Sequence, residues 1–72
     1  MKLTVKVEPI TEPAGWYVHL SSLEHTTHRY ILPEGDEFLM VNPFADPSTT
    51  SRHERRELAI AAAIKSVDHW FS

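Results

Sequence analysis

The C-terminal segment Arg52–Phe71 reads RHERRELAIAAAIKSVDHWF and contains neither glycine nor proline. Four of these residues are alanine, the residue with the highest helix propensity. Ser51 precedes the segment, and Glu54 stands three residues after that serine, which is the spacing of a capping box. The segment therefore predicts one long C-terminal helix that begins after Ser51.

An apolar stripe runs along this predicted helix when its residues are projected at intervals of about 100°. The stripe consists of Ile60, Ala63, Ile64, Val67 and Phe71, with Trp70 at its border. We expect this stripe to face the core. A helix of 20 residues is about 30 Å long, whereas the predicted strands span only about 20 Å, so one end of the helix must project past the sheet. The projecting part is expected to be the basic first two turns, which contain Arg52, His53, Arg55 and Arg56.

Upstream of the helix, apolar and polar residues alternate in the manner of half-buried strands. The predicted strands are residues 2–8, 16–20, 28–32 and 38–41. Residues 12–15 join the first two predicted strands into one hairpin, and residues 33–36 join the last two into another. Each turn has proline and glycine where a type I turn accepts them. The sequence therefore predicts an α+β fold, a four-stranded and mostly antiparallel meander of two hairpins packed on one face by the single long helix (ββββα).

The predicted core combines one side of the first hairpin with the apolar stripe of the helix. It consists of Leu3, Val5, Val7, Trp16, Val18, Tyr30 or Ile31, Ile60, Ile64, Val67 and Phe71. Trp16 and Tyr17 must point to opposite faces, because side chains alternate along a strand. The second hairpin leaves two alternatives open, since Phe38 and Met40 compete with Leu39 and Val41 for the buried face.

The composition restricts the class of protein. The chain has 72 residues, a net charge of −3, 42 % hydrophobic residues and 24 % charged residues, which is typical of one small globular domain spanning residues 1–72. It has no cysteine, which excludes disulfides and thiolate sites and fits a cytoplasmic protein. The longest apolar run, Leu58–Ile64, is too short to cross a membrane.

The basic start of the predicted helix is a candidate partner-binding surface. Arg52, Arg55 and Arg56 lie near the positive end of the helix dipole, where an anion would be stabilised. The alternative is that neighbouring carboxylates offset these arginines and nothing binds. Residues 1–50 contain three basic and seven acidic side chains, so that half would repel a nucleic-acid backbone, and an acidic protein surface suits the arginines better.

Two further surfaces are candidates for contact with another protein. Leu58 and Ala62 fall on the side of the predicted helix that faces away from the stripe, with Ala59 to one side of them, and together they would let a second helix approach closely. Tyr17 is expected on the polar face of the first hairpin, near Lys6 and His19. Each surface has an alternative without function, because a single exposed leucine and a solvated sheet face are common.

The sequence gives little support to a metal site or to catalysis. His25 and His28 form an H-x-x-H pair, but zinc needs three or four converging ligands, and His53 and His69 stand about 24 Å apart on the predicted helix. The only glycines are Gly15 and Gly35, which excludes a glycine-rich phosphate loop. We therefore expect no enzyme activity, no metal and no cofactor.

The sequence Gly15-Trp16-Tyr17-Val18 after a short N-terminal strand resembles the opening of HicB-type antitoxins. The resemblance covers about a quarter of the chain and implies a small dimeric protein that neutralises a partner. The mid-chain helix of those proteins is missing here. The function expected from the sequence is a non-enzymatic protein–protein interaction or regulatory module, inhibitor- or antitoxin-like and dimeric. The alternative is a nucleic-acid-binding domain that uses the basic turn.

Overall fold

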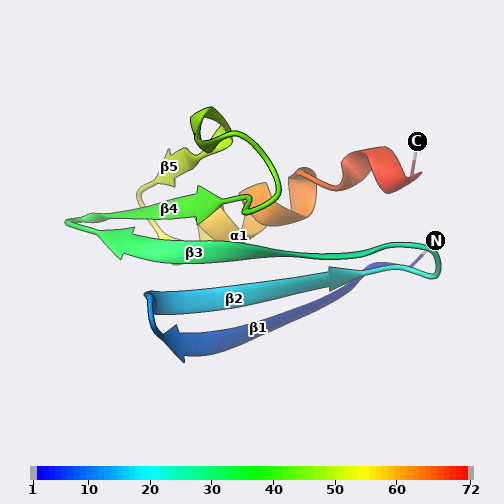
Figure 1. The fold of residues 1–72 in the computed structure, drawn as a ribbon, viewed down its shortest axis with the longest axis horizontal. Helices are drawn as coiled ribbons and strands as arrows, with labels where there is room; N and C mark the ends of the chain where they lie inside the picture. The colour runs from blue at the N-terminus through cyan, green and yellow to red at the C-terminus, as the bar shows by residue number, and fades with distance from the viewer. Residues whose placement is uncertain (1, 72) are drawn as a thin grey trace.

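The computed structural model describes residues 2–71 and contains one antiparallel sheet with a helix on one side (Figure 1). The strands are β1 (Thr4–Thr11), β2 (Ala14–Ser21), β3 (Thr26–Glu34), β4 (Glu37–Val41) and β5 (Ser51–His53). The helix α1 (Arg56–Lys65) is accompanied by two short 3-10 helices, η1 (Pro47–Thr49) and η2 (Asp68–Phe71). The strands lie in the order β1-β2-β3-β4-β5. The predicted α+β meander packed by one helix is confirmed, and a short fifth strand extends it.

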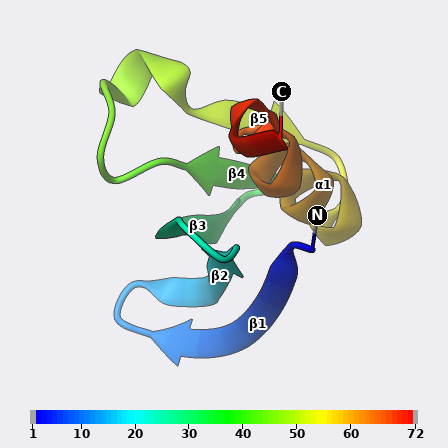
Figure 2. The ribbon, with the colours of Figure 1, turned by 90° about the vertical axis from the view of Figure 1, so that its right-hand side faces the viewer.

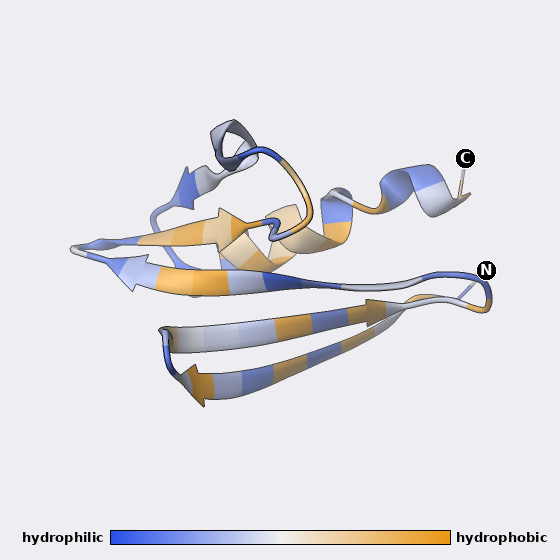
Figure 3. Cartoon of the chain, in the orientation of Figure 1, coloured by the Kyte–Doolittle hydropathy of each residue, from blue (hydrophilic) through white to orange (hydrophobic). Residues whose placement is uncertain are grey.

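Alternating side chains in β2 and β3 build the sheet side of the core. Figure 3 shows hydrophobic and hydrophilic residues alternating along β1 and β2. Val18 and Leu20 are fully buried on the face that α1 covers, and Trp16 packs beside them. The buried core consists of Val18, Leu20, Ile31, Met40, Ala59, Ala63 and Val67.

The second hairpin points Ile31 and Met40 toward the helix. These two residues lie opposite each other in the pairing of β3 with β4, and both are buried. Leu39 therefore lies on the other face, which answers the question that the sequence left open. The hairpin loop is Gly35-Asp36, and Gly35 has a φ of 59°, as the first residue of a type II′ turn requires.

The first hairpin turns one residue earlier than predicted. Thr11 pairs with Ala14, so the loop consists of Glu12 and Pro13, and Gly15 belongs to β2. A Cβ atom at Gly15 would collide with the carbonyl oxygen of Ile31 in β3. The glycine is therefore needed for the close approach of two strands, not for the turn.

The long helix expected over residues 52–71 is wrong at both ends. Residues 51–53 form β5 and pair with β4, with Ser51 opposite Met40 and His53 opposite Phe38. The helix begins after Arg55, which makes no side-chain capping hydrogen bond, so the expected capping box of Ser51 and Glu54 does not form. Pairing with β4 satisfies the backbone of this segment in place of helical hydrogen bonds.

The buried face of α1 is rotated relative to the predicted stripe. Ala59 and Ala63 are fully buried, whereas Ile60 and Ile64 pack at the margin of the core. Ala59 was expected on the outer side, and that expectation is wrong. Phe71 was expected in the core but is 38 % exposed, because it belongs to η2 and no longer follows the helical period of α1.

The helix covers only part of the sheet. It packs against β2, β3, β4 and β5. Figure 2 shows it beside the upper strands, with β1 at the far end of the sheet. Val5 and Val7 were predicted in the core, yet they are 37 % and 39 % exposed, because α1 does not extend over β1.

A buried arginine connects the sheet to the end of the helix. Arg29 lies opposite Val18 on the covered face and is only 5 % exposed. Its Nε donates to Ser66 Oγ at 3.1 Å, and its Nη1 donates to Thr27 Oγ1 at 3.0 Å and to the His28 carbonyl at 2.9 Å. Ser66 Oγ in turn donates to the Ala63 carbonyl at 2.6 Å. The guanidinium thus lies near the negative end of α1, where a cation stabilises a helix.

Replacing Gly15 with alanine is expected to destabilise the fold by about 3 kcal/mol, because the new Cβ overlaps the backbone of β3. Gly35→Ala is the matched control: its Cβ meets nothing within 4 Å, so the cost is only that of the positive φ, about 1 kcal/mol. Urea denaturation of both variants measures the difference. Equal losses in the two variants would contradict the close approach of β2 and β3.

Replacing Ser66 with alanine is expected to lower the free energy of unfolding by about 2 kcal/mol, because Arg29 Nε loses its acceptor while it stays buried. Ser48→Ala is the control, since Ser48 bonds Asp46 through its backbone amide and not through its hydroxyl. Thermal and urea unfolding measure both variants. A Ser66→Ala variant as stable as Ser48→Ala would show that this contact does not hold the helix to the sheet.

Candidate functional site

Within residues 2–71, the side of the sheet opposite α1 has no α-helix packed on it, and only the connection 42–50 with its short η1 lies there (Figure 2). Figure 2 shows α1 on one side of the strands and the connection 42–50 on the other. Five ring-bearing side chains gather on this uncovered face, and we call them the aromatic cluster. They are Tyr17, His19, His28, Tyr30 and Phe44.

The rings of the aromatic cluster contact one another directly. His28 lies at the centre: its ring stacks on Tyr17 at 4.8 Å between centroids and meets Tyr30 edge-on at 5.4 Å. Phe44 meets His28 edge-on at 4.9 Å, and His19 stacks on Tyr17 at 6.3 Å. Offset and edge-on contacts at these distances are favourable for aromatic rings. The cluster is therefore a packed layer and not a set of separate side chains.

Strand register brings the cluster together. Tyr17 lies opposite Tyr30, and His19 lies opposite His28, in the pairing of β2 with β3. Phe44 comes from the connection between β4 and β5, where its backbone N–H donates to Asn42 Oδ1 at 3.0 Å. The alternation of Trp16 and Tyr17 predicted that Tyr17 would point away from the core, and this is confirmed because Trp16 packs against the core.

Apolar residues continue the uncovered face beside the cluster. Leu32 lies opposite Leu39, and Val41 lies opposite Tyr30, all four on the face away from α1. All four side chains are half-buried on this face. Phe44 is 68 % exposed at the edge of this surface. Aromatic and apolar side chains in this arrangement are typical of a protein interface.

His28 stays uncharged more readily than an ordinary histidine. Burial lowers the pKa of its imidazole, and the positive charges of Arg29 and His19 lower that pKa further. A neutral imidazole preserves the apolar character of the cluster near neutral pH.

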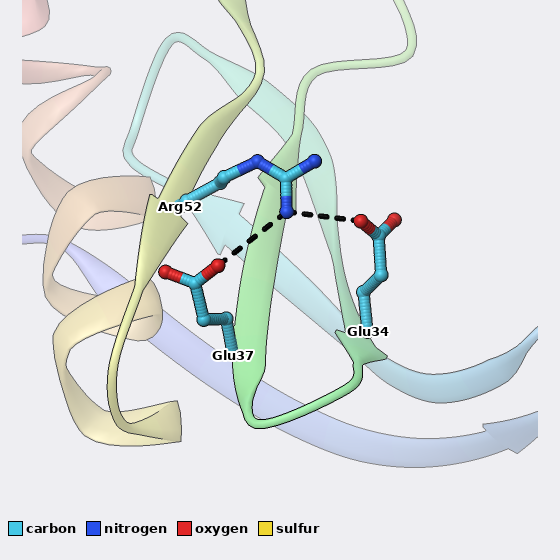
Figure 4. Close-up of polar contacts among 3 residues, drawn as sticks. All are labelled: Glu34, Glu37 and Arg52. Atoms are coloured by element: carbon cyan, nitrogen blue, oxygen red, sulfur yellow. Dashed lines mark ion pairs between the residues drawn. The ribbon is translucent and has the colours of Figure 1, made fainter.

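The three arginines of the predicted basic turn do not form one patch. Arg52 belongs to β5 and lies opposite Leu39, on the uncovered face, where its Nη1 is 2.9 Å from Glu34 Oε1 and 3.5 Å from Glu37 Oε1 (Figure 4). The hydrogen bond to Glu34 raises the pKa of the Arg52 guanidinium above its ordinary value. Two carboxylates therefore already offset its charge.

Arg55 and Arg56 lie on the other side of the sheet, at the start of α1. The guanidinium of Arg56 is 5.0 Å from the centroid of the Trp16 ring, within the range of a cation–π contact. A shallow hollow is lined there by Trp16, Phe38, Arg55, Arg56 and Glu57. The carboxylate of Glu57 in the same hollow reduces its attraction for an anion.

The outer side of α1 offers less apolar surface than expected. Leu58 is 41 % exposed, as predicted, but Ala59 is buried and Ala62 packs against the core. Both alanines, which were predicted to contact a second helix, pack instead against the core of the same chain. Leu58 remains as a single exposed side chain, which is common on protein surfaces.

The histidines outside the cluster contact aromatic or hydroxyl groups. The ring of His25 stacks on Trp70 at 5.1 Å, and His53 Nε2 lies 2.7 Å from Ser51 Oγ. Within residues 2–71, no three histidine, aspartate or glutamate side chains are grouped to hold a metal ion. The serine–histidine pair was not predicted, and in the described part of the chain no carboxylate is within ion-pair distance of His53. It lacks the third group that orients a catalytic histidine.

The comparisons with known proteins give no relative. No protein-family model matches the chain, and neither a curated protein nor a solved structure matches it. The HicB-type antitoxins that residues 15–18 resemble are thus not among the matches. Among the described helices, none has the length and hydropathy that a membrane crossing requires.

Lowering the pH from about 7 to about 5 is expected to destabilise the protein, because the unfolded chain, in which a histidine has a pKa of about 6.5, binds a proton before folded His28 does. His28→Gln is expected to make this loss of stability smaller. NMR titration of the His28 ring gives a direct reading. A titration midpoint at or above the ordinary histidine value would contradict the burial of this ring in the cluster.

Proposed function

We propose that this chain is a non-enzymatic, cytoplasmic protein-binding module of a regulatory kind, such as an inhibitor- or antitoxin-like protein, and that it acts as a dimer. The uncovered sheet face carries this proposal. The helix α1 packs on the other face of the sheet, so it does not cover the aromatic cluster and its apolar neighbours (Figure 2). Contiguous apolar surfaces of this kind mark sites of protein association.

The charges around the uncovered face favour a protein partner over a polyanion. Lys6 and Glu8 stand 3.8 Å apart at one margin, and Arg52 is paired with Glu34 and Glu37 at the other. Lys6 and Arg52 therefore each have an acidic neighbour. The contact energy must come from burial of rings and aliphatic side chains, as in the centre of protein interfaces.

Nucleic-acid binding remains the alternative proposal, with weaker support. Stacking of bases on aromatic rings is effective where a positively charged groove also follows the phosphates. The aromatic cluster lies on one face of the sheet with Arg52, whereas Arg56 lies over Trp16 on the other face. These arginines and the cluster do not line one continuous groove.

Phe44→Ser is expected to reduce retention of a protein partner at least about tenfold, because Phe44 is the most exposed ring of the cluster and an aromatic residue that anchors an interface contributes this much. The measurement is capture from cell extract on the immobilised chain, with quantitative mass spectrometry of what wild type and variant each retain. Circular dichroism checks that Phe44→Ser is folded.

Leu58→Ser is the matched control, an exposed apolar residue on the outer side of α1. It is expected to retain the same proteins as the wild type. If partners were lost with Leu58→Ser but kept with Phe44→Ser, the binding surface would be on α1 and not on the uncovered sheet face. Tight binding of a mixed-sequence oligonucleotide at low salt, lost steeply as salt is added, would favour the nucleic-acid alternative.

A further inference from the structure

The strand β1 forms a long, uncovered edge of the sheet. It pairs with β2 on one side, and among the strands of residues 2–71 none lies on its other side (Figure 1). Val5 and Val7 are more than one-third exposed on its helix-side face, because α1 packs against the other strands. An edge of eight residues with free backbone groups is a template for pairing with another chain.

We propose that two copies of this chain pair antiparallel through β1, with Val7 of each copy on the two-fold axis. The inference rests on the dimer of the proposed function and gives that dimer an interface and a register. It is separate from the aromatic cluster, which lies on β2, β3 and the connection after β4.

The charges of β1 favour this register, because it pairs each charged residue of the strand with one of opposite sign. Lys6 and Glu8 point to the same face and flank Val7. With Val7 on the axis, Lys6 of each copy lies opposite Glu8 of the other, so two pairs of opposite charges form. A shift of the axis to Lys6 would place two lysines opposite each other, and a shift to Glu8 would place two carboxylates opposite each other. Like charges directly opposite are destabilising in a sheet.

The remaining residues of β1 are compatible with this pairing. Val5 lies opposite Pro9 of the second copy, and Thr4 lies opposite Ile10 of the second copy, so apolar atoms meet on both faces. Pro9 has no backbone N–H and costs at most one hydrogen bond at each end of the interface. The two Val7 side chains meet at the centre and lose the exposure that they have in a single chain.

The arrangement closes on itself. A two-fold axis perpendicular to the sheet joins two sheets edge to edge, with both copies of α1 on one side and both aromatic clusters on the other. The opposite edge of each sheet is the three-residue β5, where Arg52 is already held by Glu34 and Glu37. Only one long edge is free in each copy, which favours a dimer over a fibre.

Charge reversal tests the register. Lys6→Glu and Glu8→Lys are each expected to weaken self-association at least about tenfold, because each variant places like charges opposite one another twice. An equimolar mixture of the two variants is expected to associate as the wild type does, since every pair across the axis is again of opposite sign. Sedimentation velocity at a series of concentrations measures all four samples.

A unique thiol tests the position of the axis. The chain has no cysteine, so Val7→Cys introduces a single one. Paired strands place two such residues about 5 Å apart between Cα atoms, within disulfide range, and oxidation is expected to yield a covalent dimer. Thr4→Cys is the control, because this register separates the two Thr4 positions by about 20 Å.

The possible results separate this inference from the proposed function. A dimer that ignores both charge reversals, or that cross-links through Thr4→Cys as readily as through Val7→Cys, would overturn the β1 interface and leave the dimer standing. A wild type that stays monomeric at every concentration would overturn the interface and the dimer together. Capture of a partner that depends on Phe44 tests the binding face by itself.

Discussion

The buried guanidinium of Arg29 is the constraint on which the arrangement of helix and sheet depends. Among residues 2–71 no carboxylate forms an ion pair with it, and its hydrogen bonds go to Ser66, Thr27 and the backbone of β3. Because Ser66 ends α1, the charge is stabilised only while the helix terminus stays over the middle strand. The contact therefore holds the end of α1 against the covered face of the sheet. The helix packs on β2, β3, β4 and β5, and it covers neither Val5 and Val7 of β1 nor the opposite face (Figure 2).

The alternation of apolar and polar residues was sufficient to predict the strands, but the local sequence did not predict where the helix begins and ends. Alternation located the four main strands and their antiparallel order, because each pairs with its neighbour in sequence. Residues 52–53 were predicted to start the helix, but residues 51–53 pair with β4, and only the tertiary structure reveals that pairing. Gly15 was assigned to a turn because turns are its usual place, whereas the approach of Ile31 that requires it comes from another strand. The helix phase shifted because two alanines, not isoleucines, fit closest to the sheet.

Of the five residues of the aromatic cluster, Tyr17 and His19 were predicted together on one face of the first hairpin, and the other three were missed. Tyr17 could be placed away from the core by alternation with Trp16. His28 and Tyr30 could not, because the sequence leaves the orientation of the second hairpin open until the Ile31–Met40 pair is known. Phe44 reaches the face through a connection ordered by Asn42, a side-chain hydrogen bond with no periodic signal. The predicted basic patch does not form, because the prediction placed all three arginines on one helix. In the structure Arg52 lies in β5, whereas Arg55 and Arg56 lie at the start of α1.

The meander order also determines how this chain can reach its fold. Every strand pairs with its sequence neighbour, so each step of sheet formation closes only a short loop and costs little chain entropy. The 37-residue separation between Arg29 and Ser66 is the long-range closure that remains once the hairpins exist. Rapid zippering of hairpins followed by one slower docking event is the kinetic order that such a topology favours. Because α1 follows all five strands in the sequence, the residues that complete the core leave a ribosome only after the whole sheet has emerged.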